Sequence, residues 1–406
     1  MKTSTRTIIL AGLGALCAQP TFADSFSDAI SEGETHLNLR YRYEFVDQDS
    51  FSENANASTL RGRLNWLSGG YNNFRGFVEF DAVGEIFIDD YNSGMGTSSP
   101  VRSRYPVVAD PNGTDLNQVY LQYSGWEGTN VRVGRQRILL DNQRFVGGVG
   151  WRQNEQTYDA ASITHKFNDN AKVFYAYVDN VNRIFGEDVA AGDHESSTHL
   201  LNASYKFEDT GTLTGYYYGI DNDDSPGAST DTIGVRFTGG TSFSDRPVKY
   251  LVEYARQSDA ANNPVDYDAD YFRLDGSINL GQVTAMAGYE LLSGDSSMGG
   301  AAFRTPLATL HAFNGWADQF LGTPSSGLTD TWVGASGKLD VWSWKALYHF
   351  LDSDESSADF GDEIDLSIGR KVGENYGVLF KAAMFNADAA SFVDVTKFWF
   401  MFTANY

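Results

Sequence analysis

The 406-residue sequence contains 53 acidic and 30 basic residues, giving a formal net charge of -23, and 42% of its residues are hydrophobic. A chain with this hydrophobic content and only 20% charged residues is not intrinsically disordered. The acidic excess argues against nucleic-acid binding, because phosphates require a basic protein surface. Beyond the N-terminal region there is no apolar run of about 18 residues, which excludes helical membrane spans.

The N-terminal residues predict a secretory signal peptide. Two basic residues precede an apolar segment over residues 8–18, and a Thr-Phe-Ala tripeptide then places small residues where a signal peptidase reads them. We therefore predict cleavage between Ala23 and Asp24, so that residues 1–23 form the signal peptide and residues 24–406 the mature protein. Removal of the two basic residues leaves a mature formal charge of -25.

The single cysteine, Cys17, lies within this leader. A lipoprotein signal is the alternative interpretation, but Leu16 stands where such a signal needs a small residue. The mature chain has no cysteine for a disulfide, so its stability must come from packing or from closure of the backbone.

Residues 37–46 alternate between two kinds of side chain, which is the period of an extended strand. One face carries Leu37, Leu39, Tyr41, Tyr43 and Phe45, and the other carries Asn38, Arg40, Arg42 and Glu44. Residues 58–67 repeat the pattern with Arg61 and Arg63 on the polar face. In residues 74–88 the polar face carries Arg75, Glu79, Asp81 and Glu85. Similar segments follow to the C-terminus, and helical periodicity is scarce.

About 18 such segments run through the chain, most of them near the length that a tilted strand needs to cross a bilayer. Their connections alternate between tight turns and long polar loops, the latter at residues 89–114, 182–196, 259–267, 293–328 and 352–362. Short periplasmic turns and long extracellular loops are typical of outer-membrane barrels. The sequence therefore predicts an all-β fold, a single-chain transmembrane antiparallel β-barrel in the Gram-negative outer membrane.

The arginine-bearing face of these strands must point into the lumen, because an arginine at the lipid midplane would cost roughly 2–4 kcal/mol. The predicted lumen and substrate-binding residues are Arg40, Arg42, Arg61, Arg63, Arg75, Arg132, Arg144, Arg152 and Arg273. Arg144 and Arg152 belong to a loop whose glycines, Gly147, Gly148 and Gly150, allow it to fold inward. The alternative is a wall of internal ion pairs, in which the acidic residues of the same strand faces neutralise the arginines.

Arg135 and Arg137 do not follow this pattern, because they share the parity of Val131 and Val133 on the lipid face. Either a bulge switches the face, or the strand has left the bilayer and the two arginines bind lipopolysaccharide phosphates. The acidic loops at residues 266–270 and 352–363 are interpreted as a solvated rim, bridged by divalent ions to lipopolysaccharide.

The C-terminal sequence KFWFMFTANY places Phe398, Phe400, Phe402 and Tyr406 on one face. An aromatic ending of this kind resembles the strand that the bacterial barrel-assembly machinery recognises. The alternative is an ordinary hydrophobic edge strand.

Motifs for catalysis are not found: the sequence has no G-x-S-x-G, no H-E-x-x-H, no phosphate-binding G-x-x-x-x-G-K and no paired cysteines. The six histidines are scattered, so a barrel-embedded Ser-His hydrolase is retained only as an alternative. We expect a protein that is not an enzyme and has no catalytic residues, cofactor or metal site.

Two stretches, residues 133–160 and 303–324, resemble characteristic segments of the alginate-export family of outer-membrane barrels. The resemblance implies an 18-stranded barrel whose pore, lined with arginine and lysine, passes an anionic polyuronate. In the second stretch, PLATLHAFNGWADQF is apolar enough for a short helix, either capping the rim or constricting the lumen.

These observations predict a channel with a cationic lumen that passes anionic oligo- or polysaccharides, or other anionic solutes, by diffusion. A general nutrient porin with little selectivity is the main alternative. The expected partners are the anionic solute, outer-membrane lipid, lipopolysaccharide and the barrel-assembly machinery.

Overall fold

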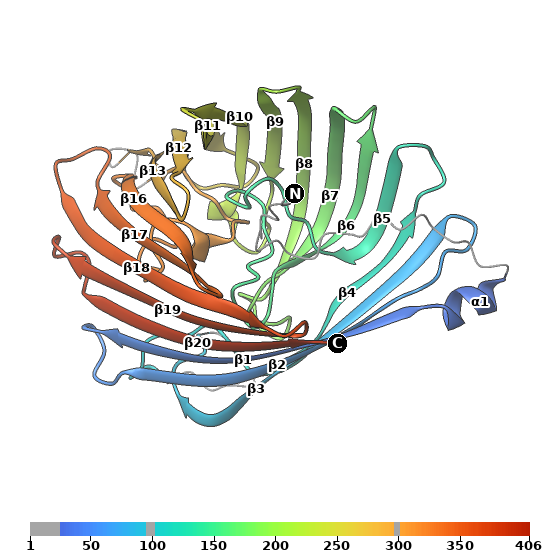
Figure 1. The fold of residues 1–406 in the computed structure, drawn as a ribbon, viewed down its shortest axis with the longest axis horizontal. Helices are drawn as coiled ribbons and strands as arrows, with labels where there is room; N and C mark the ends of the chain where they lie inside the picture. Colours follow the sequence, from blue (N-terminus) through green and yellow to red (C-terminus); the bar gives the residue numbers. More distant parts are fainter. Residues whose placement is uncertain (1–24, 95–101, 296–300) are drawn as a thin grey trace.

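The computed structural model describes residues 25–94, 102–295 and 301–406, so the predicted signal peptide and its cleavage site between Ala23 and Asp24 lie outside the described residues. Within this part of the chain, 18 strands form one antiparallel sheet that closes on itself where the first strand pairs with the last (Figure 1). The predicted fold class and the estimate of about 18 strands are confirmed. No helix among the described residues has the length and apolar character needed to cross a membrane.

Each barrel strand is hydrogen-bonded to the strands that precede and follow it in the sequence. The first nine are β1 (Glu34–Gln48), β2 (Ala55–Leu67), β3 (Phe74–Asp90), β4 (Gly113–Tyr123), β5 (Thr129–Gln136), β6 (Thr157–Lys166), β7 (Ala171–Asn182), β8 (Asp193–Phe207) and β9 (Gly211–Ile220). The others are β10 (Thr230–Phe243), β11 (Arg246–Asp259), β12 (Asp268–Asn279), β13 (Val283–Leu292), β16 (Leu328–Leu339), β17 (Trp342–Asp352), β18 (Asp359–Val372), β19 (Tyr376–Ala387) and β20 (Val395–Asn405).

The remaining elements are short and are not part of the barrel sheet. The helix α1 (Phe26–Ser31) precedes β1, and Ser25 caps it by accepting a hydrogen bond from the Asp28 N–H. A two-residue hairpin, β14 (Gly294–Asp295) and β15 (Ala301–Ala302), lies in the connection between β13 and β16. Single 3-10 turns occur at η1 (Pro226–Ala228) and η3 (Leu310–Ala312).

The strand faces follow the alternation of the sequence. In β1, Arg40 and Arg42 are 7% and 0% exposed inside the barrel, whereas Tyr41, which lies between them in the sequence, contacts the ring of Phe400 on the outer face. The β1–β2 register places Arg40 opposite Arg61. Large apolar side chains remain exposed on the other face, where lipid would cover them, and the buried cluster lies within the barrel.

The last strand closes the barrel through its backbone and its aromatic side chains. The backbone N–H groups of Leu37 and Tyr406 each donate to the carbonyl of the other residue at 2.9 Å. Phe400 contacts the ring of Phe380 at 5.1 Å between centroids, and Phe402 stacks on Tyr376 at 5.7 Å. The C-terminal residues therefore connect the two ends of the sheet.

Deleting Tyr406, or replacing Phe400 and Phe402 with serine, should lower the yield of folded barrel, because closing hydrogen bonds or ring contacts are lost. The folded fraction is measured by heat-modifiable migration on gels. The matched control is Phe207→Ser, which removes an exposed aromatic side chain at the end of β8. Equal yields for the C-terminal variants and this control would show that the ending is an ordinary strand.

Candidate functional site

Two loops fold into the barrel. Inner loop 1 (residues 137–156) connects β5 to β6, and inner loop 2 (residues 303–327) completes the connection from β13 to β16. They meet at a bridge between Val146 and Leu307, where the Gly147 N–H donates to the Leu307 carbonyl at 2.8 Å. A Cβ on Gly147 would lie 2.3 Å from Oγ1 of Thr309, so glycine is required for this close approach.

Both inner loops correspond to the stretches that the sequence singled out, and both lie inside the barrel rather than over its rim. An aromatic cluster holds them to the wall: the Phe145 ring lies 5.3 Å from Tyr216, 5.1 Å from Tyr271 and 5.8 Å from Phe303. Aromatic pairs at these distances stabilise by about 0.5–1.5 kcal/mol beyond the area that they bury. The lumen is therefore narrowed by packed protein.

Arg40 and Arg61 face inward as predicted, and inner loop 1 covers them. Arg40 donates to the side chain of Gln153 at 2.8 Å, to the Gly150 carbonyl at 2.9 Å and to the Arg152 carbonyl. Arg61 donates to the Gln153 carbonyl at 3.2 Å and to Asn38 at 2.6 Å. These two arginines satisfy backbone carbonyls of a buried loop, which would otherwise lack partners.

Arg42 binds the same part of inner loop 1 and also Asp110. Its guanidinium contacts the Asp110 carboxylate and the Trp151 carbonyl, and Asp110 accepts the Gln153 N–H at 2.7 Å. Burial alone would raise the pKa of Asp110, but Arg42, Arg152 and this N–H together hold it below its ordinary value. Asp110, which lies between β3 and β4, was not predicted, because nothing in its local sequence marks it.

Arg63 belongs to a second ion-pair network with Arg137. Arg63 pairs with Asp81 and lies 3.3 Å from Glu155, while Arg137 pairs with Glu155 and lies 2.8 Å from Glu79. Arg137 and Arg63 hold the pKa of Glu155 well below its ordinary value although burial opposes this. The network ties inner loop 1 to β2 and β3.

A bulge in β4 completes this network. The register with β3 shifts between Glu79 and Phe80, so that Asn117 and Gln118 both point inward and donate to Glu79 at 2.8 Å. Gln118 also accepts the Arg137 N–H at 3.0 Å. Arg137 faces the lumen because β5 has ended at Gln136, and not because a bulge switches its strand face.

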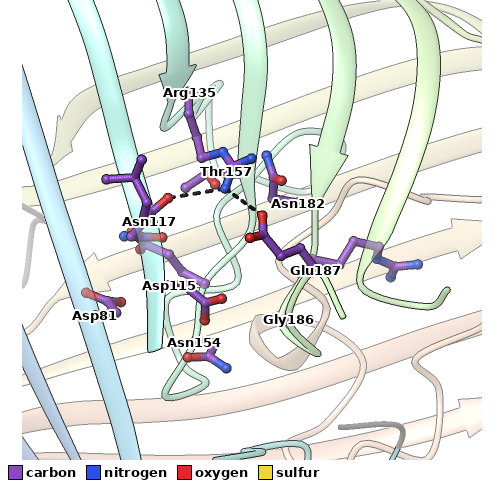
Figure 2. Close-up of a pocket in the computed structure, with 12 residues that line it drawn as sticks. Asp81, Asp115, Asn117, Arg135, Asn154, Thr157, Asn182, Gly186 and Glu187 are labelled. Atoms are coloured by element: carbon purple, nitrogen blue, oxygen red, sulfur yellow. Dashed lines mark hydrogen bonds and ion pairs between the residues drawn. The ribbon is translucent and has the colours of Figure 1, made fainter. Parts of the chain in front are cut away.

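Arg135 keeps the outward parity of Val133 and closes a seam in the barrel wall. β4 and β5 share five residue pairs, fewer than any other neighbours in the described sheet. Arg135 belongs to the pair at one end of this short ladder. Its side chain donates to the Leu116 carbonyl at 3.2 Å and pairs with Glu187 at 3.2 Å, beside a small polar pocket (Figure 2). It also pairs with Asp159 at 2.8 Å.

Arg144 and Arg273 approach each other around Glu290. Arg144 donates to Glu290 at 2.7 Å and to Asn314 at 2.8 Å, and Arg273 pairs with Asp275 at 2.9 Å and lies 3.4 Å from Glu290. Both guanidinium groups also lie over the ring of Phe313, at 4.8 and 5.1 Å. Arg144 therefore joins inner loop 1 to inner loop 2 and to β13.

Arg152 pairs with Glu44 on β1 at 3.1 Å and with Asp318 of inner loop 2 at 3.1 Å. Lys397 on β20 lies 2.8 Å from the same Asp318 carboxylate. Burial would raise the pKa of Asp318, but His311, Lys397 and Arg152 hold it well below its ordinary value. Asp318 and Lys397 were missed at the sequence level, since their proximity depends on how inner loop 2 folds.

Several inward cations make no ion pair among the residues that the structure describes. Those that are half-buried include Arg75 on β3, Arg132 on β5, Arg183 beyond β7 and Lys345 on β17. Arg132 donates to Gln122 at 2.9 Å and lies over the Tyr120 ring at 5.0 Å. Across the described ranges, no set of three histidine, cysteine, aspartate or glutamate side chains is arranged to hold a metal ion.

A closed barrel with an apolar outer wall and a charged interior narrowed by two loops is an outer-membrane channel. The family model described as alginate export matches residues 33–295, and the chain belongs to this family. Comparison with curated proteins finds no match.

Solved structures show the same fold. OccK3 (OpdO) of Pseudomonas aeruginosa is 14% identical with a TM-score of 0.70, covering 94% of this chain and 97% of that one. OccAB2 of Acinetobacter baumannii is 15% identical with a TM-score of 0.73, covering 93% and 99%. P. aeruginosa OpdK, crystallised with vanillate, is 12% identical with a TM-score of 0.71, covering 93% and 99%.

Asp110→Ala should release part of inner loop 1. Removing one partner of a buried ion pair typically costs about 3–5 kcal/mol, because the remaining charge is left uncompensated. We expect trypsin to cleave the folded variant after Arg152, which is 6% exposed in the intact protein. Asp266→Ala, at an exposed loop position, is the control and should leave cleavage unchanged. Equal resistance of both variants would show that Asp110 does not hold the loop.

Proposed function

We propose that this outer-membrane channel passes anionic solutes by diffusion, carboxylate-bearing oligosaccharides such as short uronates among them. The observation that carries the proposal is the distribution of ion pairs in the lumen. Inward acidic side chains such as Glu44, Glu79 and Glu290 are about 1–2% exposed and paired with arginines. The half-buried cations Arg75 and Arg132 lack such partners among the described residues.

Arg75 and Arg132 lie in one row across neighbouring strands. The register pairs Arg75 with Gln122, and Gln122 with Arg132, so two strand spacings of about 5 Å separate the two arginines. Arginine stays charged at working pH and binds carboxylates with two parallel hydrogen bonds. Two such groups side by side would attract a carboxylate and pass it on.

In this proposal the nine predicted lumen arginines divide into three roles. Arg40, Arg42, Arg61, Arg144 and Arg152 hold the inner loops, because their donors are used on loop carbonyls and buried carboxylates. Arg75 and Arg132 contact the solute. Arg63 and Arg273, whose side chains are 11% and 12% exposed, add positive charge from within ion-paired networks.

The narrowed lumen favours short solutes over a continuous polymer. A general porin with little charge preference is the second candidate, and the many internal ion pairs support it, because paired charges produce little net field. For the hydrolase alternative, no serine hydroxyl bonds a histidine ring among the residues that the structure describes, and we propose no catalytic role.

The proposed partners follow from the surfaces of the barrel. Outer-membrane lipid would cover the exposed apolar side chains, including Phe80 and Ile233, which are 51% and 64% exposed. Divalent ions would bridge the acidic rim to lipopolysaccharide, and the assembly machinery would bind β20 during folding. No cofactor is part of the proposal.

Replacing Arg75 and Arg132 together with glutamine should shift the reversal potential toward cation preference and weaken block by oligouronates. Glutamine keeps the polar shape but removes two positive charges from the passage. The measurement is the reversal potential in planar bilayers under a salt gradient, with and without oligouronates.

The matched control is Arg256→Gln, because Arg256 lies on the outer face, 61% exposed and paired with Asp268 at 3.2 Å. It makes the same kind of substitution, removing one positive charge outside the lumen, and should leave the reversal potential unchanged. If the lumen variant folds and behaves like this control, the two arginines do not select anions and the general porin is the better description.

A further inference from the structure

The ammonium group of Lys381 lies inside a cage of three tryptophan rings. Its Nζ is 3.6 Å from the ring centroid of Trp316, 4.3 Å from Trp151 and 5.4 Å from Trp399. The rings come from inner loop 2, inner loop 1 and β20, while Lys381 belongs to β19 and is 9% exposed. A single cation thus touches both inner loops and the wall.

Among the described residues, Lys381 makes no ion pair. Its Nζ lies 2.6 Å from Nε2 of His311. A lysine ammonium only donates, so Nε2 must accept, and the other ring nitrogen carries the hydrogen. That nitrogen, Nδ1, donates to Asp318 at 2.7 Å. The His311 ring is therefore neutral, and it stacks on Trp151 at 4.5 Å with an interplanar angle of 8°.

Charged groups surround this contact on every packed element. Asp318 is shared with Arg152 of inner loop 1 and Lys397 of β20, and Arg152 continues to Glu44 on β1. On β18, Asp365 accepts the Trp316 N–H at 3.2 Å and Glu363 accepts the Ala317 N–H at 2.7 Å. Lys345 on β17 lies 5.8 Å from the Trp316 ring.

We propose that Lys381 and His311 form a latch that holds both inner loops against β19 and β20, and that acid releases it. The proposal rests on the chain being a channel and adds a way in which its passage is regulated. It uses a contact that the proposed solute path does not need, since the latch is formed by β19, β20 and the inner loops, whereas Arg75 and Arg132 lie on β3 and β5.

Protonation of His311 is incompatible with the closed geometry. It would place an N–H opposite an ammonium group at 2.6 Å, so that the ring or the lysine must move. Burial lowers the pKa of His311 to about 3, with Asp318 opposing and Lys381 reinforcing the effect. A released ring in water would return to an ordinary value near 6.5.

The direction of the pH effect follows from proton linkage. The closed state binds fewer protons at His311 than the released state whenever the pH lies between about 3 and 6.5. Through His311, lowering the pH across this range therefore favours release by up to about tenfold per pH unit, and above pH 6.5 the contribution of His311 disappears. Between pH 6.5 and 5 the expected shift in the ratio of open to closed channels is at most about 30-fold.

Three variants separate the latch from other acid effects. His311→Gln retains an acceptor for Lys381 but cannot titrate in this range, so the part of the acid response that depends on His311 should be lost. Lys381→Met removes the cation from the cage and should give larger or more frequent openings at both pH values. Lys249→Met is the control, since it removes an exposed lysine on β11, away from the tryptophan cage.

The experiment records single-channel openings in planar bilayers at pH 7.5 and pH 5.0, after folding has been checked by heat-modifiability. Wild-type protein and Lys249→Met should both open more at pH 5.0, whereas His311→Gln should lose most of this response. An acid response in His311→Gln equal to that of wild type, or no response in wild type, would overturn the proposal.

If Lys381→Met does not fold, the comparison of wild type with His311→Gln still decides the question. The readout is also independent of ion selectivity. If replacing Arg75 and Arg132 leaves the reversal potential unchanged, the proposed anion preference is refuted. If the acid response is nevertheless normal and is lost in His311→Gln, the latch is supported.

Discussion

The constraint on which the structure depends is that a bilayer offers no hydrogen-bond partners to a polypeptide backbone. Strands can meet it only by closing the sheet, which is why the backbone of Tyr406 pairs with Leu37 across the ends of the chain. Closure then fixes the two faces: apolar side chains such as Ile233 remain exposed to lipid, and Arg40 and Arg42 are carried inward. The bilayer thus directs the charged side chains into the lumen, where they can act on a passing solute.

Burying so many charges requires partners, and the two inner loops supply many of them. Arg42 and Arg152 meet carboxylates from β1, from the connection after β3 and from inner loop 2, so that one set of ion pairs fixes several segments at once. The same pairing that stabilises the loops leaves positive charge unmatched at Arg75 and Arg132. In the proposed function, selectivity and loop position therefore rest on different residues, which can be varied separately.

The strand faces could be predicted from the sequence because a strand has a fixed period of two, and this placed Arg40, Arg61 and Arg63 correctly inside. The alternative interpretation, in which acidic residues of the same strand faces neutralise the arginines, applies to Arg63, which pairs with Asp81. Partners such as Asp110 and Asp318 could not be predicted, because their positions depend on loop conformations set by distant contacts. The orientation of Arg137 depended on β5 ending at Gln136, one residue earlier, which local sequence does not mark.

The most direct test of the central claim is the reversal potential of the wild-type channel in planar bilayers separating two concentrations of potassium chloride. A lumen whose unmatched charges are positive should shift the reversal potential from zero toward the equilibrium potential of chloride. This preference for chloride should weaken as salt screens the arginines. A reversal potential on the potassium side, unchanged by salt, would contradict an anion-selective passage through this barrel.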